Sequence, residues 1–183
     1  MYILGISCYY HDAAACIVKD GKIVAAAEEE RFTRKKHDSS FPVHAIRYCL
    51  REAGITAKQL DHVSYYEKPV LKFQRMLNQH FQMAPRSFRI FKESLVSWTT
   101  KMDVEKKIRE ELSYTREITC MEHHASHAAS AFLPSPFEEA AIVTVDGVGE
   151  WATTTIGIGK GSTVKILKEI HFPHSLRLLY STM

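Results

Sequence analysis

Residues 3–24 set the fold class, and they read Ile3-Leu-Gly-Ile-Ser-Cys-Tyr-Tyr-His-Asp-Ala-Ala-Ala-Cys-Ile-Val-Lys-Asp-Gly-Lys-Ile-Val24. Asp20-Gly21 separates two apolar runs, and this dipeptide predicts a hairpin turn because glycine readily takes a positive φ. His11 and Asp12 form a polar interruption earlier in the stretch. The apolar and β-prone runs predict three strands, at residues 2–9, 13–18 and 23–27.

A second stretch, residues 141–167, repeats this order of strand, polar loop, strand, glycine turn and strand. Its loop begins at Asp146, and its expected strands lie at 140–145, 151–158 and 163–170. Repeated units of this kind favour the two-lobed ATPase fold shared by actin and the sugar kinases. We therefore expect an α/β, actin-like (ribonuclease-H-like) lobe with a mixed sheet and flanking helices, followed by the first strands of a second lobe.

The region between the two repeats is mainly helical. Apolar spacing predicts helices at 43–53, 69–116 (broken near Pro85, with Leu95 among its apolar positions) and 123–132, and a short strand at 61–66. Residues 28–38 are charged and are expected to form a loop or a strand end. The expected domains are a first lobe at 1–138, with a helical insertion at about 68–117, and the start of a truncated second lobe at 139–183.

The composition is that of a globular chain. Its 183 residues are 45% hydrophobic and 25% charged, with a formal charge of +3, which excludes disordered and collagen-like classes. We interpret the lysines and arginines of residues 68–116 as a solvated helix face rather than a nucleic-acid site. The sequence has no apolar run of about 20 residues, so we expect no membrane span, and its first residues lead us to expect no signal peptide. The four scattered cysteines predict a reduced, cytoplasmic chain: Cys8, Cys16, Cys49 and Cys120.

Three histidines within five residues give the strongest chemical signal. His123 and His127 stand at i and i+4, so on a helix both can reach one ion. His124 points about 100° away and cannot join them. Imidazole suits Zn, Fe, Ni or Cu, and the spacing does not choose among these metals. The alternative is a helix with incidental surface histidines, which the small, apolar surroundings make less attractive.

A second signal is Asp146-Gly147-Val-Gly149-Glu150, at the end of an expected buried strand. Asp146 could supply a third ligand and complete a set of two histidines and one carboxylate with open positions. Gly147 and Gly149 could present backbone N–H groups to phosphate oxygens. The plain alternative is a turn in which these residues only shape the backbone.

Two further motifs are weaker. His11, between two apolar strands and followed by small residues, could donate to a phosphate or exchange a proton with it, or could be a turn histidine. The basic loop could neutralise an anionic substrate, although charge runs are usually solvated. Its members are Arg31, Arg34, Lys35 and Lys36.

Five motifs in fixed order carry a resemblance to a known family. They cover residues 10–14, 28–34, 123–132, 145–150 and 172–176. Together they closely resemble the N-terminal part of the nodulation-type carbamoyltransferases, which carbamoylate nodulation factors and certain antibiotics. The resemblance extends over essentially the whole chain.

The resemblance implies a fold and a reaction. It implies an actin-like domain, related to the tRNA threonylcarbamoyl-transfer proteins, that binds a divalent metal, iron being the expected one, with ATP nearby. Carbamoyl phosphate and ATP would form a carbamoyl-adenylate, and the carbamoyl group would pass to a hydroxyl of a small molecule. Nucleic acid and membrane are not expected partners.

The resemblance also implies roles for individual residues. His123, His127 and Asp146 would be metal ligands, and His11 and Lys36 would lie near carbamoyl phosphate as catalytic residues. The hairpin 147–155 would face nucleotide phosphates. The expected cofactor-binding residues are Asp12, Gly147, Gly149 and Thr153.

Two departures from the family pattern stand out. Family members are several hundred residues long, and they usually carry glycine where this chain has Arg177. We therefore expect a fragment, a truncated product or a split subunit that needs the C-terminal part of the enzyme and is inactive alone. Two alternatives remain. One is a tRNA threonylcarbamoyl-transfer relative, which the basic segment at residues 68–116 would favour. The other is a truncated non-catalytic lobe acting as a binding module.

Overall fold

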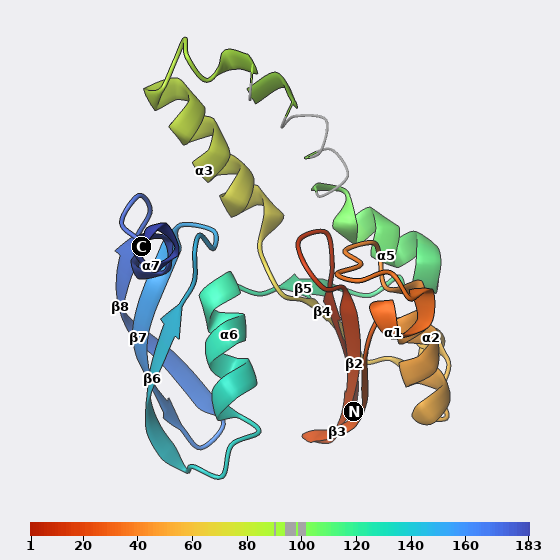
Figure 1. Ribbon diagram of the computed structural model, residues 1–183. Coiled ribbons are helices and arrows are strands. Elements are labelled where there is room, and N and C mark those ends of the chain that lie inside the picture. The colour runs from red at the N-terminus through yellow and green to blue at the C-terminus, as the bar shows by residue number, and fades with distance from the viewer. Residues whose placement is uncertain (90, 94–97, 99–101) are drawn as a thin grey trace. The chain divides into compact units, whose positions relative to one another are not determined.

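The computed structural model describes residues 1–89, 91–93, 98 and 102–183 (Figure 1). The chain divides into two compact units. Unit 1 comprises residues 1–66 and 94–120, and unit 2 comprises residues 67–93 and 121–183. Leu95, expected on a helix, lies outside the described residues.

Unit 1 is built on a five-stranded mixed sheet. Its strands are β1 (Tyr2–Ser7), β2 (Ala14–Lys19), β3 (Lys22–Glu28), β4 (His62–Tyr65) and β5 (Ile118–Cys120). Their order is β3-β2-β1-β4-β5, with β1, β2 and β3 antiparallel and β1, β4 and β5 parallel. Asp20 and Gly21 turn the β2–β3 hairpin with φ angles of 49° and 79°, as the sequence predicts. This order and these directions are those of an actin-like lobe, which confirms the expected fold class.

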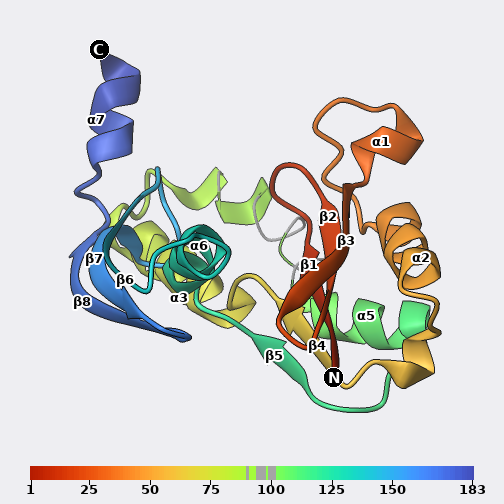
Figure 2. The same ribbon diagram turned by 90° about the horizontal axis from the view of Figure 1, so that it is seen from below.

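One face of this sheet forms the core of unit 1. Leu4 of β1 lies opposite Ile17 of β2 and Val63 of β4, so the three side chains share a face, and all are fully buried. Two helices cover this face, α2 (Val43–Glu52) and α5 (Val104–Leu112) (Figure 2). They contribute Ile46 and Ile108 to the same core, because both helices have apolar residues at helical spacing.

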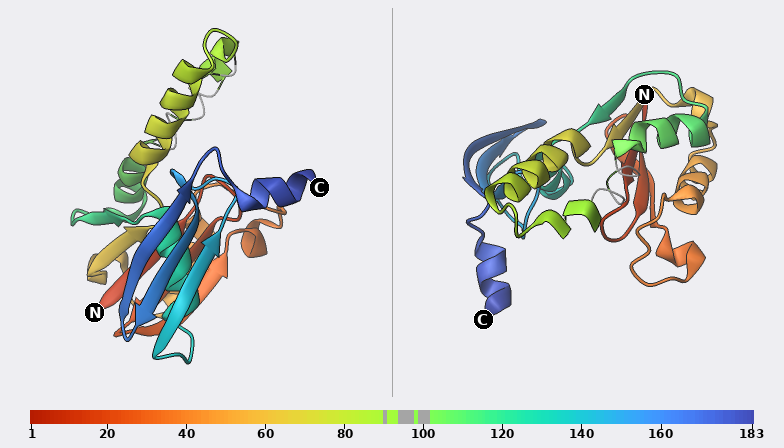
Figure 3. Two further views of the ribbon diagram at one scale, coloured as in Figure 1. Left: turned by 90° about the vertical axis from the view of Figure 1, so that its left-hand side faces the viewer. Right: turned by 90° about the horizontal axis from the view of Figure 1, so that it is seen from above.

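Unit 2 contains a three-stranded antiparallel sheet (Figure 3). Its strands are β6 (Glu139–Val145), β7 (Ala152–Lys160) and β8 (Thr163–His171). Helix α6 (His123–Phe132) contacts all three strands and buries Ala128 and Phe132 against Ile142. Unit 2 also contains the helices α3 (Pro69–Gln82) and α7 (Leu176–Thr182). The strand, loop, strand, turn, strand order expected from the repeat is therefore present in both units.

Four short elements were not expected from the sequence. They are α1 (Glu30–Thr33), the 3₁₀ turn Ala57–Gln59, β5 and α7. The strand β5 pairs with β4 and has only three residues. These are too few for an alternation of apolar and polar positions to appear in the sequence. Helix α1 is a single turn that ends at Arg34, whose φ is 58°. None of the described helices has both the length and the apolar character needed to cross a membrane.

The contacts within the chain divide it differently from the expected boundary at residue 138. Helix α6 packs on β6–β8, so the division falls between Cys120 and Met121. The helical segment at 68–117 is itself divided, with α3 in unit 2 and α5 in unit 1. The assignment of two lobes within a longer protein stays a prediction.

The buried carboxylate of Glu29 caps the N-terminus of helix α2. The Oε1 and Oε2 atoms of Glu29 accept the backbone N–H groups of His44 (3.1 Å) and Ala45 (2.8 Å), and Oε1 lies 2.6 Å from Nδ1 of His44. The first N–H groups of a helix have no partner within the helix, and an anion there also interacts favourably with its dipole. Pro42, at the N-cap, provides no such side chain. Glu29 therefore caps α2 from a distant part of the chain.

We expect Glu29→Ala to lower the free energy of unfolding by about 1.5–3 kcal/mol, because two helix N–H groups lose a charged acceptor. Equilibrium unfolding in urea, followed by circular dichroism, measures this loss. Glu28→Ala is the control, because Glu28 forms only an exposed ion pair with Arg31 in the described structure, and such pairs contribute little. Equal destabilisation by both substitutions would refute the capping role.

Candidate functional site

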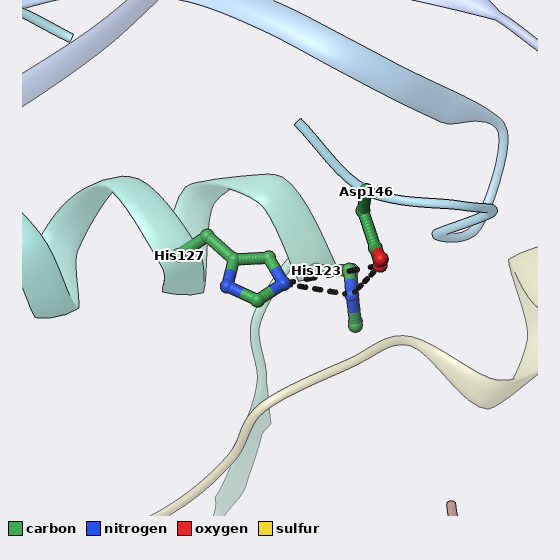
Figure 4. A group of neighbouring side chains, drawn as sticks. All are labelled: His123, His127 and Asp146. Carbon is green, nitrogen blue, oxygen red and sulfur yellow. Dashed lines mark hydrogen bonds and ion pairs between the residues drawn. The ribbon is translucent and has the colours of Figure 1, made fainter. Parts of the chain in front are cut away.

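The two histidines at i and i+4 lie on one side of α6 and point toward each other (Figure 4). The Nε2 atoms of His123 and His127 are 3.0 Å apart. His123 is buried, whereas His127 is exposed. Although part of the His127 side chain is exposed, the partial desolvation of its ring lowers its pKa, and the neighbouring His123 lowers it further. A neutral imidazole offers a lone pair to a metal ion.

Asp146 follows the last residue of β6 and brings a carboxylate to the histidines. Its Oδ2 atom lies 2.9 Å from Nε2 of His123 and 3.9 Å from Nε2 of His127. Its Oδ1 atom accepts the N–H of Gly147 (2.7 Å) and an N–H of Arg177 (2.5 Å). The hydrogen bond with His123, followed by those with Gly147 and Arg177, holds the pKa of Asp146 well below its usual range. Asp146 is therefore an anion with one oxygen directed at the two imidazoles.

The three side chains fit a single metal ion. The three ligand atoms lie within 4.8 Å of one another. At separations of 2.9, 3.0 and 3.9 Å one point lies about 2 Å from all three atoms, which is the usual length of a bond from a protein ligand to zinc. Two imidazoles and one carboxylate also suit iron, and they leave coordination positions open for substrate.

His124 is excluded from this ligand set by its own hydrogen bonds. Its Nε2 lies 2.8 Å from the carbonyl oxygen of Ala152, which can only accept, so Nε2 carries the proton. Its Nδ1 lies 2.5 Å from the hydroxyl of Thr144, which in turn lies 2.7 Å from that of Thr155. Burial lowers the pKa of His124, consistent with a neutral ring. His124 thus joins α6 to the sheet.

In the hairpin expected to contact nucleotide phosphates, the N–H groups of Gly147 and Gly149 and the hydroxyl of Thr153 already form hydrogen bonds within the chain. The N–H of Gly147 bonds to Asp146, and that of Gly149 bonds to the Ala152 carbonyl (3.1 Å). Thr153 is fully buried, and its hydroxyl donates to backbone carbonyls of β8 and the segment after it. A nucleotide contact at these positions stays a prediction, and for the buried Thr153 side chain the geometry offers no support.

Gly149 has a different structural role. A Cβ atom there would lie 2.9 Å from the Ala152 oxygen and 3.0–3.1 Å from the rings of His124 and His123. A side chain at this position would therefore displace the backbone or the histidine rings. The glycine allows the loop to close against the start of α6.

The residues expected near carbamoyl phosphate lie in unit 1, in two adjacent loops. The backbone N–H of Tyr9 bonds to Ser39, and His37 Nδ1 lies 2.8 Å from Asp12 Oδ1. These contacts bring the exposed His11, in the same loop as Asp12, to the segment that contains the exposed Lys36. The hydrogen bond with His37 lowers the pKa of Asp12. The loops that carry His11 and Lys36 are therefore hydrogen-bonded to each other, while the roles of the two residues stay predictions.

Several charged residues near the sites were not identified from the sequence. His37 contacts Asp12, and with Glu30 these residues form a second group with ligand atoms within 4.8 Å of one another. Glu67 and Lys72 form a buried ion pair of 2.7 Å in unit 2. Glu150 is buried, and its Oε1 accepts the Lys68 N–H, at 2.5 Å. Their positions in charged segments gave no sequence signal for burial.

Comparisons with known proteins agree on one family. The model described as the carbamoyltransferase N-terminus matches residues 2–183. An uncharacterized protein of Synechocystis sp. is 53% identical over 189 residues, covering 98% of this chain and 31% of its own length. The nodulation protein NolNO of Sinorhizobium fredii is 34% identical over 176 residues, covering 94% of this chain and 25% of its own length.

The chain thus spans about a third or less of the curated relatives it matches. Among solved structures, YeaZ from Pseudomonas aeruginosa aligns over 92% of this chain and 67% of its own, with a TM-score of 0.43 and 13% identity.

We expect His123→Ala or His127→Ala to abolish stoichiometric binding of a divalent metal, because each removes a direct ligand. His124→Ala is the matched control on the same helix and should reduce binding much less, because both of its ring nitrogens already have partners. Elemental analysis of folded, desalted protein measures the metal content. Equal metal content in all three variants would contradict the ligand assignment.

Arg177 should weaken metal binding, because its guanidinium neutralises the Asp146 carboxylate. We expect Arg177→Met to raise the affinity for Zn²⁺ severalfold, up to about tenfold, since the side chain is partly exposed and its charge is screened. Competition with a chromophoric chelator gives the affinity. Lys168→Met removes one positive charge from the exposed side of β8 and should have little effect. An unchanged affinity in Arg177→Met would show that the pair does not oppose metal binding.

Proposed function

Because the chain belongs to the carbamoyltransferase family through its N-terminal domain, we propose that it is the N-terminal portion of an O-carbamoyltransferase. In this proposal water releases phosphate from carbamoyl phosphate, the resulting carbamate displaces pyrophosphate from ATP to give a carbamoyl-adenylate, and transfer of the carbamoyl group to a hydroxyl of a small molecule releases AMP. The family match over residues 2–183 favours this function over the tRNA-modifying and non-catalytic alternatives.

The convergence of two imidazoles and a carboxylate supports the proposal most directly. His123, His127 and Asp146 would hold a divalent metal, for which we propose iron. Such an ion, when bound, supplies Lewis acidity toward a carbamoyl or phosphate oxygen. Asp146 keeps its negative charge over the physiological pH range because its pKa is depressed.

Two loops of unit 1 suit an anionic substrate. Carbamoyl phosphate is a dianion, and Lys36 is exposed in the segment that contacts the His11–Asp12 loop. Lysine acts as a point charge on a flexible stem, which suits an anion that arrives and leaves. We propose that Lys36 neutralises the phosphate and that His11 donates to it or exchanges a proton with it.

ATP is proposed as the second substrate. We propose that its phosphates approach the hairpin at residues 147–155, where Gly147 and Gly149 lie, and we keep Asp12 of unit 1 as a further proposed nucleotide-binding residue. Contact with their N–H groups requires replacement of the hydrogen bonds that they now make to Asp146 and Ala152. Binding of ATP should therefore reorganise this loop.

The remaining part of the enzyme has a surface available to it in unit 2. The side of the β6–β8 sheet that lies opposite the buried Ile142 and Thr144 exposes a row of aliphatic side chains: Val143, Val145, Ile156, Ile158, Leu167 and Ile170. Sheets that are apolar on both faces are usually buried on both. We propose that further chain of the enzyme covers this row.

The four cysteines are free, and we propose a cytoplasmic location.

We expect Lys36→Ala, in a full-length family context, to raise the apparent KM for carbamoyl phosphate about tenfold or more, because one charge-assisted contact contributes about 1.5–3 kcal/mol. The KM for ATP should stay nearly unchanged. Pyrophosphate release that depends on carbamoyl phosphate provides the assay.

Lys35→Ala is the matched control, because Lys35 is the neighbouring lysine and lies 3.8 Å from Asp38. It should leave both KM values almost unchanged. A shift in the KM for ATP alone would assign Lys36 to the nucleotide. Absence of carbamoyl-dependent pyrophosphate release from the unmodified enzyme would refute the proposed reaction.

A further inference from the structure

The buried ion pair between Glu67 and Lys72 has no role in the ligand set described above. Their side chains are 4% and 6% exposed, and Oε2 of Glu67 lies 2.7 Å from Nζ of Lys72. Burial of two charges costs desolvation energy that their attraction need not recover, and well-packed apolar residues often stabilise a protein as well or better. Stability alone therefore does not account for this pair.

The pair lies beside the ring of His123. Oε2 of Glu67, the oxygen that contacts Lys72, is 3.8 Å from Nδ1 of His123. The other ring nitrogen, Nε2, is the atom directed at Asp146 and His127. The imidazole thus has a buried carboxylate on one side and the proposed metal ligands on the other.

The chemistry of imidazole gives this arrangement a function. A neutral imidazole that offers Nε2 to a metal carries its only proton on Nδ1. In a buried site this N–H needs an acceptor, and an ionised carboxylate is the strongest available kind. Histidine ligands of metals commonly donate this proton to a carboxylate, which fixes the ring and increases its basicity.

Two contacts hold Glu67 in place. Lys72, one turn into α3, provides the buried cation. The N–H of the following residue, Lys68, donates to Glu150, which lies in the loop after β6. Glu67 is therefore joined to α3 through Lys72 and, through its neighbour Lys68, to the loop after β6.

We infer that Glu67 is a positioning residue for His123: its carboxylate accepts a hydrogen bond from Nδ1–H when Nε2 binds a metal ion, and Lys72 holds that carboxylate in its orientation. The inference rests on the metal site of the proposed function. It assigns no direct contact between Glu67 and the metal.

The test uses the 183-residue chain with the double substitution Glu67→Leu/Lys72→Met, because a glutamine at position 67 would still offer an acceptor oxygen to Nδ1. This variant removes one positive and one negative charge, so the net charge is unchanged and no buried charge is left unpaired. We expect the affinity for Zn²⁺ to fall about 10–100-fold, as for loss of such an outer carboxylate in other metal sites. Competition with a chromophoric chelator measures the affinity, and circular dichroism confirms folding.

A second readout separates positioning from a general structural effect. In the Zn²⁺-loaded chain, long-range ¹H–¹⁵N NMR of the histidine rings should show the His123 proton on Nδ1 and protected from exchange. In the double variant this protection should be lost. Glu122→Gln is the control, because Glu122 precedes His123 but is exposed and pairs with Lys68; it should alter neither measurement.

The possible outcomes are distinct. Weaker binding and lost protection in the double variant alone support the inference. Equal affinities and equal protection in the double variant and the unmodified chain overturn it while leaving the proposed metal site intact. Absence of Zn²⁺ binding by the unmodified chain overturns both. If the double variant does not fold, Glu67→Asp, which withdraws the carboxylate from Nδ1, should weaken binding about tenfold, and unchanged binding overturns the inference.

Discussion

The placement of the His123 ring is the constraint on which unit 2 depends. The ring stands at the first residue of α6, with Asp146 2.9 Å from Nε2 and Glu67 3.8 Å from Nδ1. Gly149 closes over it because no Cβ fits there. Segments that are distant in sequence, at residues 67–72, 123–127 and 146–150, meet around this one imidazole.

The two units use buried charge differently. In unit 1 the core is apolar, and the buried Glu29 carboxylate is used to begin α2. In unit 2 the buried charged groups Glu67, Lys72, Asp146 and Glu150 gather at the N-terminal end of α6. Such groups are costly to bury unless they are paired or bind an ion. Their concentration in one place supports the proposed metal site.

The fold, which the structure confirms, and the metal ligands, which stay a proposal, were both predicted from local patterns in the sequence. The Asp20-Gly21 hairpin, the repeat of three strands and the bounds of α6 follow from turn chemistry and periodicity over ten residues or fewer. Contacts between distant segments leave no such pattern. Glu29 appeared as a member of a charged run and Glu67 carried no sequence signal, yet one caps a helix and the other lies beside His123. Thr153 appeared available for a ligand, but the pairing of β7 with β8 buries its hydroxyl.

X-ray absorption spectroscopy of the 183-residue chain loaded with one equivalent of Zn²⁺ tests the central claim most directly, because it reports the atoms bound to the ion. The account predicts a shell of nitrogen and oxygen ligands at about 2.0–2.1 Å, with outer-shell scattering from two imidazoles. Loss of one imidazole in His127→Ala should be visible in the same spectrum. A shell without imidazole scattering, or one unchanged by that substitution, would contradict the assignment of His123, His127 and Asp146 as the metal site.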